Sequence, residues 1–414
     1  MQVDANLREV RLQDSLPFDA GEEMDFETFP PGRAVFALFP QEQPGLTAQP
    51  YLSTTRDFRR RLRRLLAEPQ SFSRRLNLRQ VTRRIDYQST GSAFESQWLP
   101  FLLNQFYYPR HFHRRLRLKM PALLKLNLRN RFPRCYPARR IREDGSRYYG
   151  PFPSRAVAER FAAEFLDLFK IRRCVPDLEP NPSHPGCIYS QMHMCLAPCF
   201  KGCTDEEYQQ EVQRVTGFLD SEGARFVQEL ESEREGASAN LEFEQAARLH
   251  RRLEKAREVL RFKPALVREI SSLHAILILP GAQEKSVLFF RVVGGELRGP
   301  APLSLEENVS APISLDQQIQ QTLSSLARPG GSIQPGSSAP LETPAPLPPW
   351  EHLALLARWY YSSFRAGELV MLPADQEIPH VRLIRLCRKL ISEPSEAPRP
   401  PQPETLPKAA RQEG

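Results

Sequence analysis

The order of apolar and polar positions predicts a mixed α/β chain that begins with strand, loop and helix. An apolar run at 34–39 predicts a buried strand, and a loop containing proline and glycine separates it from a strongly basic helix at 55–66. A second helical pattern covers 93–106 and is interrupted by Pro100. Short apolar runs between turn signals are typical of strands, whereas longer periodic stretches are typical of helices.

The next part of the chain alternates between the two patterns. Alternating leucines and the Asp144-Gly145 pair predict strands and a β-hairpin within 123–149. Phenylalanines and leucines at helical spacing predict a helix at 156–169, with Ser154 as its N-cap.

A long helical region follows from Thr204 to Leu260. It opens with a capping box at 204–207, and residues 235–238 predict a break between two helices. A new amphipathic helix is then expected to begin near Ala239.

After Pro264 the pattern changes to β-structure and then to an α/β unit. A Gly-Gly pair predicts a hairpin between the second and third strands of this unit. The expected elements are strands at 273–279, 286–293, 296–299 and 368–372, and helices at 313–326, 350–364 and 380–391. A Pro/Ser/Gly linker at 328–349 and a proline-rich tail at 393–414 are expected to be disordered.

Composition narrows the class of protein. A chain of 414 residues can form two or three domains, and it contains no apolar run of membrane-spanning length. The N-terminus lacks the apolar core of a signal peptide, so a cytoplasmic location without membrane contact is expected. In a reducing compartment, seven cysteines favour metal ligation or free thiols over disulfides.

Charge is concentrated in one region. Residues 50–130 contain eighteen Arg or Lys and four Asp or Glu, a balance of +14, whereas the whole chain is +8. This polarity is typical of a surface for a polyanion, most simply nucleic acid. The alternative is a solvated helix face.

Four cysteines lie close together at Cys174, Cys187, Cys195 and Cys199. Such a group can supply one tetrathiolate centre, and a metal would explain how an irregular segment rich in proline and glycine stays folded. Zinc would fit the same sulfurs, although the paired C-x-x-C spacing of zinc ribbons is absent, which favours an iron–sulfur cluster.

The helix after Ala239 carries a clear apolar side. Its members are Leu241, Phe243, Ala246, Ala247, Leu249 and Leu253. Two helices alone bury too little area to be stable, so a hairpin with this face is expected to dock on a partner. The alternative is packing against the helix at 204–222 within the same chain.

Three motifs resemble the UvrC family, the dual-incision nuclease subunit of bacterial nucleotide excision repair. The run RYYGPFPS at 147–154 is similar to a family motif, and the cysteine stretch matches in spacing. The run NLEFEQAA at 240–247 looks like the UVR motif, through which UvrC-type proteins pair with UvrB. The resemblance implies a 4Fe–4S cluster on the four cysteines, DNA as a ligand and UvrB as a partner.

The resemblance also implies a domain plan of α/β and α+β units. The expected divisions are a polar segment (1–28), a degenerate GIY-YIG-like nuclease domain (29–121), a β-hairpin, helix and Cys-cluster region (122–203), a helical region with the UVR motif (204–262, motif 226–261), an α/β linker-type domain (268–392) and the tail (393–414). The RNase H-like and helix-hairpin-helix domains of the family are expected to be missing.

The nuclease motifs are incomplete. By resemblance, Tyr51 and Arg61 match the family's catalytic tyrosine and arginine, but Ala34 stands where the first motif has its tyrosine. The metal-holding glutamate aligns with Pro100. Glu95, five residues earlier, lies roughly 140° away around a helix and is a poor substitute. A catalytic divalent metal is therefore expected to be lost.

The expected function is a non-catalytic, UvrC-like adaptor that binds DNA and UvrB. Two groups of arginines are the candidate DNA contacts: Arg59, Arg60, Arg63 and Arg64 in the first helix, and Arg114, Arg115 and Arg117 further on. One alternative is an active single-incision nuclease that uses Tyr51, Arg61 and Glu95. Another is a cluster-bearing redox or metal sensor.

Overall fold

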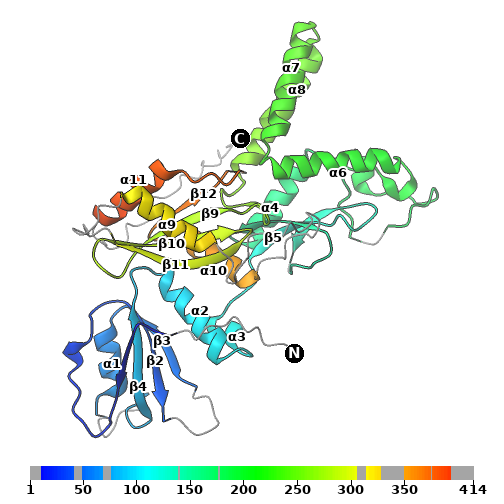
Figure 1. Cartoon of the computed structure of the whole chain (residues 1–414). Coiled ribbons are helices and arrows are strands. Elements are labelled where there is room, and N and C mark those ends of the chain that lie inside the picture. Colours follow the sequence, from blue (N-terminus) through cyan, green and yellow to red (C-terminus); the bar gives the residue numbers. More distant parts are fainter. Residues whose placement is uncertain are drawn as a thin grey trace, which may run out of the picture.

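The computed structural model describes residues 11–392, except 42–48, 69–75, 139, 176–177, 305–313, 328–348 and 374. Within this part of the chain the strands form three four-stranded sheets (Figure 1). Their strand orders are β1-β4-β2-β3, β6-β5-β7-β8 and β11-β10-β9-β12. The tail expected at 393–414 and all but Pro349 of the expected linker lie outside the described residues. No described helix is long and apolar enough to cross a membrane.

The first sheet and two helices form the N-terminal unit. Its elements are β1 (Asp14–Pro17), β2 (Ala34–Pro40), β3 (Tyr51–Thr55), α1 (Phe58–Leu66), β4 (Thr82–Ser89), α2 (Glu95–Tyr107) and α3 (Phe112–Leu116). Strand β2 is almost continuously apolar because both of its faces are covered. Phe36 and Leu38 pack in the core under α1, and Val35 and Ala37 pack against α2.

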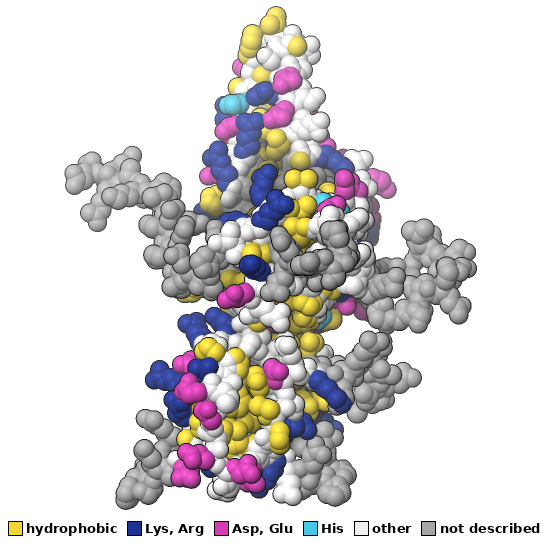
Figure 2. Space-filling view, turned by 60° about the vertical axis from the view of Figure 1, so that its left-hand side comes forward, with side chains coloured by type: hydrophobic (Ala, Val, Ile, Leu, Met, Phe, Trp, Pro, Cys, Tyr) yellow, Lys and Arg dark blue, Asp and Glu magenta, His cyan; other side chains and the backbone are white. Residues whose placement is uncertain are grey.

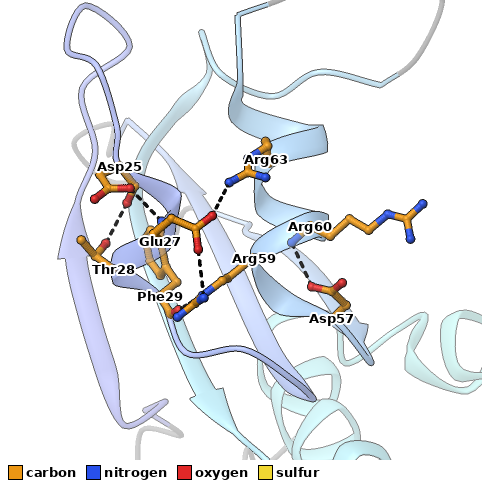
Figure 3. Close-up of polar contacts among 8 residues, drawn as sticks. All are labelled: Asp25, Glu27, Thr28, Phe29, Asp57, Arg59, Arg60 and Arg63. Atoms are coloured by element: carbon orange, nitrogen blue, oxygen red, sulfur yellow. Dashed lines mark hydrogen bonds and ion pairs between the residues drawn. The ribbon is translucent and has the colours of Figure 1, made fainter.

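Part of the expected polar segment 1–28 belongs to this unit. Strand β1 pairs with β4, and the short helix η1 (Phe26–Thr28) docks on α1. The Glu27 carboxylate accepts hydrogen bonds from Arg59 at 2.9 Å and from Arg63 at 2.7 Å (Figure 3). These contacts hold the N-terminal segment against the basic helix.

The second sheet lies in the middle unit. It contains β5 (Ala122–Leu126), β6 (Cys135–Ala138), β7 (Arg147–Phe152) and β8 (Arg268–Glu269), and α4 (Arg155–Leu166) follows β7. The hairpin predicted at Asp144-Gly145 is wrong in its pairing, because β6 and β7 both pair with β5 and not with each other. Asp144 instead forms an ion pair with Lys125 on β5. Ser154 caps α4 as predicted, accepting a hydrogen bond from Val157 N.

Three long helices extend from this unit: α6 (Asp205–Asp220), α7 (Ala224–Ala239) and α8 (Phe243–Arg261). The capping box is confirmed, with Thr204 N donating to Glu207 Oε2 at 2.8 Å and Glu207 N donating to Thr204 Oγ1 at 3.1 Å. The break predicted at 235–238 is wrong, because α7 continues through these residues and the chain turns at 240–242. A helix interior tolerates Gly236 at a cost of about 1 kcal/mol, and packing of α7 along α8 offsets it.

The third sheet lies in the C-terminal unit. Its elements are β9 (Ala275–Pro280), β10 (Ser286–Val293), β11 (Glu296–Ser304), α9 (Leu315–Ala327), α10 (Trp350–Tyr360), β12 (Glu368–Met371) and α11 (His380–Ser392). The predicted Gly-Gly hairpin is confirmed, with both glycines at positive φ between β10 and β11. Helices α9 and α11 cover one face of the sheet, and α10 covers the other.

Helix α2 belongs to two cores at once. Leu99 and Leu103 pack against the N-terminal sheet, whereas Phe94, Trp98 and Phe101 pack into the core of the C-terminal unit. The predicted interruption at Pro100 is also wrong, since the helix runs from 95 to 107 with this proline inside it. Proline in a helix interior costs about 3 kcal/mol, which the burial on both sides of α2 offsets.

The start of α2 is closely packed against β9. A Cβ atom added to Gly91 would lie 2.1 Å from the Gly281 carbonyl oxygen, so only glycine fits there. Glu95 is 3% exposed, and its carboxylate accepts a hydrogen bond from Gly91 N at 2.9 Å. Burial raises the pKa of Glu95 to about 7, and this hydrogen bond only partly opposes the effect.

This buried carboxyl predicts a pH-dependent stability. The folded chain binds the Glu95 proton more tightly than the unfolded chain does, so the free energy of unfolding should fall as pH rises from about 4.5 to above 7. We expect the free energy of unfolding of the wild type to fall by about 2–3 kcal/mol between pH 5 and pH 8, and this decrease to be absent in Glu95→Gln. Urea denaturation at both pH values measures it. The exposed Glu23→Gln should behave like wild type, and an unchanged pH dependence in Glu95→Gln would contradict the prediction.

Candidate functional site

The structure brings together the two nuclease residues that the resemblance singled out. Tyr51 lies on β3 and Arg61 on α1, and the Arg61 guanidinium donates a hydrogen bond to the Tyr51 hydroxyl at 2.9 Å. Asp57 fixes the start of α1 by accepting a hydrogen bond from Arg60 N at 3.0 Å (Figure 3). A phenol beside a guanidinium can bind a phosphate oxygen, but it cannot by itself hold a divalent cation.

The remaining nuclease positions offer no carboxylate to this pair. Ala34 is buried at the start of β2, and Pro100 is buried within α2. Glu95 is buried at the start of α2, where its carboxylate accepts the hydrogen bond from Gly91 N. Among the described residues, no Asp or Glu forms an ion pair with Arg61, and its buried Nε atom lacks a hydrogen-bond partner. Within the described residues, these positions therefore supply no exposed carboxylate to the pair.

The four candidate DNA contacts on α1 divide into arginines that are paired with a carboxylate and arginines that are not. Arg59 and Arg63 are held by Glu27, whereas Arg60 and Arg64 are exposed. Figure 3 shows the Arg60 side chain extending away from this ion-pair group. Only the second kind keeps its full charge for an external anion, since a bound carboxylate already neutralises the first.

The arginines near α3 are also exposed. Arg115 donates to Asn104 Oδ1 at 2.8 Å, and its guanidinium lies 3.8 Å from the centre of the Tyr108 ring. Arg114 has no such partner among the described contacts, and Arg117 ends α3 in the left-handed conformation at φ 51°. This end of the unit presents cations whose positions are set by the fold.

The four cysteines line one hollow in the middle unit. Cys174 and Cys195 lie in loops, Cys187 precedes the short helix α5 (Ile188–Gln191), and Cys199 lies in η2 (Pro198–Phe200). No carboxylate lines this hollow, and the potential ligands His184, His193 and Cys203 of the same segment lie outside it.

Burial and the mutual repulsion of the thiolates favour neutral thiols in this hollow, and a thiophilic metal or cluster would remove that preference. Desolvation, followed by the charges of the other three thiols, raises the pKa of Cys195 to about 11. Ala197 N donates to the Cys195 sulfur at 3.3 Å. The donor set is therefore chemically suited to a thiophilic metal or cluster. Within the part of the chain that is described, however, no three His, Cys, Asp or Glu side chains have the arrangement of a formed metal site.

Arg172 is a site residue that sequence reasoning missed. It is 1% exposed, donates from Nε to the Phe132 carbonyl at 2.9 Å, and places Nη1 3.6 Å from the Cys174 sulfur. The Arg172 guanidinium thus connects the wall of the hollow to the backbone at Phe132. Its position two residues before a cysteine was the available signal, but arginine is too common in this chain for that signal to stand out.

The free end of the α7–α8 hairpin is apolar and exposed. Leu241 is 70% exposed and Phe243 is 68% exposed. Figure 2 shows hydrophobic side chains at the free end of this hairpin and basic ones along it. Ala246 and Leu249 are half-buried and Ala247 is exposed, whereas Leu253 is completely buried. Leu253 therefore packs within the chain and is not available to a partner.

The base of the hairpin is fixed in the core of the middle unit. Phe226 of α7 contacts Phe169 and Phe218 at ring-centre distances of 5.1 and 5.7 Å. Lys255 of α8 forms an ion pair with Glu164 of α4 at 3.1 Å. The hairpin thus has an anchored base and a free end (Figure 1).

The middle unit is similar in sequence to a known protein domain. Residues 122–218 match the family model described as "UvrC/Cho excinuclease, middle domain". No solved structure matches the chain.

Curated relatives named UvrABC system protein C align over longer stretches. The protein from Syntrophomonas wolfei is 28% identical over 60% of this chain and 41% of its own length. That from Paenarthrobacter aurescens is 24% identical over 74% and 45%, and that from Moorella thermoacetica is 36% identical over 33% and 22%. The chain thus spans less than half the length of these relatives. Residues 122–218 of the chain are thus similar to the middle domain of the UvrC family, and the similarity to UvrABC system protein C extends beyond them.

Proposed function

We propose that this protein is a DNA-binding adaptor of nucleotide excision repair that does not cut DNA itself. The similarity to the UvrC middle domain and to UvrABC system protein C supports a role in excision repair. The observation that carries the adaptor proposal is the pairing of an exposed apolar hairpin end with a nuclease site whose carboxylate is replaced or buried. Such a protein would connect DNA to a partner without supplying the metal for hydrolysis.

The partner in this proposal is UvrB, bound through the UVR motif. Leu241 and Phe243 lie at the turn between α7 and α8, where an incoming helix pair could bury them. Burying two such side chains contributes about 3–6 kcal/mol of transfer free energy before the costs of association. Leu253 has the separate role of holding the hairpin base.

An active nuclease is the second candidate, and the intact Tyr51–Arg61 hydrogen bond favours it. In that case a carboxylate would have to approach this pair from elsewhere. The burial of Glu95 argues against it, because this side chain would have to leave its buried position and its hydrogen bond with Gly91 N.

For the cysteines we propose a 4Fe–4S cluster, with zinc as the alternative ligand. Cys174, Cys187, Cys195 and Cys199 would hold it, and its charge would offset the mutual repulsion of four thiolates. Its role in this proposal is structural, stabilising an irregular segment between the DNA-binding part and the hairpin.

The adaptor proposal predicts the absence of specific nicking. Purified protein, with and without UvrB, is incubated on a lesion-bearing duplex with magnesium or manganese. We expect any background cleavage to be the same in wild type, Arg61→Ala and Glu95→Gln, since the site lacks a metal-holding acid. Arg60→Ala, an exposed neighbour on α1, is the matched control. Metal-dependent nicking lost in Arg61→Ala but kept in Arg60→Ala would establish the nuclease instead.

The hairpin proposal predicts a selective loss of partner binding. We expect Leu241→Asp combined with Phe243→Asp to weaken UvrB binding at least tenfold, because charge would be buried at the contact. Titration calorimetry measures the affinity. The melting temperature should not change, since both side chains are exposed. The control is Phe364→Asp with Val381→Asp, two exposed apolar positions elsewhere. Equal weakening by the control pair would remove the hairpin from the interface.

The cluster proposal predicts a broad visible absorption band that bleaches on reduction. We expect Cys195→Ser to lose the band, because this thiol lies in the shared hollow. Cys203→Ser should retain it, because its thiol lies outside. Stoichiometric zinc without iron in anaerobically purified protein would overturn the cluster and support zinc.

A further inference from the structure

A large cleft separates the middle unit from α10 of the C-terminal unit. Its volume is about 530 Å³, and it is open to solvent. Its walls come from the segment before β5, from the end of the RYYGPFPS motif and from α10. Tyr361, at the end of α10, donates a hydrogen bond to the Pro151 carbonyl at 2.8 Å and fixes the two walls together.

The charged side chains that line this cleft are all cations. They are Arg117, Lys119, Arg155 and Arg358, and no Asp or Glu lines the space. We name these four residues the basic cleft. Arg155 is paired with Glu159, but among the described ion pairs no carboxylate neutralises the other three. Four cations around one concave space create a local potential that attracts anions.

The backbone reinforces this preference. Helix α4 begins at the cleft with Arg155, and its N-cap Ser154 lines the wall. The first N–H groups of a helix point out of its N-terminus and carry partial positive charge. The motif at 147–154 therefore has a local structural use: it directs the start of α4 toward the cations of the neighbouring segments.

The remaining lining is apolar and compact. It consists of Met120, Pro121, Ala122, Pro137, Ala138, Phe152, Pro153, Ala354 and Ala357. A ligand that fits must therefore combine negative charge with an apolar part of about nucleotide size. A double helix about 20 Å wide cannot enter a space of this volume, whereas one or two units of a single strand can.

We propose that the basic cleft binds the phosphates and sugars of single-stranded DNA. This inference rests on the proposed DNA-binding function and deepens it by naming the surface and the form of DNA. Phe152 is 1% exposed and cannot stack on a base, so the four cations supply the main contacts for a strand through its phosphates. Lesion processing exposes unpaired strands, which gives a repair protein a use for such a cleft.

The test uses the full chain with two matched double variants. Lys119→Glu with Arg155→Glu reverses two charges in the basic cleft. Arg385→Glu with Lys389→Glu makes the same change in net charge at exposed positions on α11, which covers the opposite face of the third sheet. Fluorescence anisotropy measures binding to a labelled single strand and to the matching duplex at fixed salt, followed by a salt titration.

We expect the cleft variant to bind the single strand at least about tenfold more weakly and with a flatter salt dependence, because phosphate contacts are lost. The α11 variant should lose less than about threefold. Melting curves check folding, and the milder Lys119→Gln with Arg155→Gln should weaken binding in the same direction.

Three outcomes would overturn the inference. Equal losses in the two charge-reversed variants would mean that only net charge matters. Wild-type binding that is confined to the duplex and indifferent to the cleft variants would exclude the cleft while DNA binding stands. Failure of the wild type to bind either DNA would overturn the proposed function and the cleft together.

Discussion

The shared burial of α2 is the constraint on which the arrangement of this protein depends. Leu99 and Leu103 require the N-terminal sheet, and Phe94, Trp98 and Phe101 require the core around Phe290. The Trp98 ring lies 5.6 Å from that of Phe290, and the Phe94 ring lies 5.1 Å from it. One helix therefore cannot leave either core without exposing large aromatic surfaces, each worth about 2–3 kcal/mol.

This packing also bears on the proposed loss of nuclease chemistry. A catalytic carboxylate must reach a metal and solvent, whereas Glu95 is buried at the start of α2 and keeps its proton to about pH 7. Pro100, at the position of the expected metal ligand, contributes apolar surface to the same helix. Helix α2 of the N-terminal unit thus packs against the C-terminal unit, whereas Arg60 and Arg64 of α1 lie at the outer surface.

The sequence was sufficient for elements whose signal is local. The capping box at 204–207, the Ser154 cap and the Gly-Gly hairpin depend on neighbouring residues alone, and all three are confirmed. The pairing of β6 with β5, the continuity of α2 through Pro100 and the strand β1 depend on tertiary partners, which periodicity does not report. The family resemblance identified Tyr51 and Arg61, which the structure brings together. The sequence did not reveal that Arg358, far along the chain, shares a cleft with Arg117, because that contact depends on the tertiary fold.

The hairpin formed by α7 and α8 is fixed at its base and extends away from the core at its other end. Helix α8 has 19 residues, so it is about 28 Å long, and its lower half shares a core with α4 and α6. Leu178, Leu196 and Cys203 of the cysteine segment pack against that same core. A rotation of about 5° at the base would displace the far end by about 2.5 Å over this length. Any rotation of the hairpin about its base would therefore move Leu241 and Phe243 farther than the residues packed in the core.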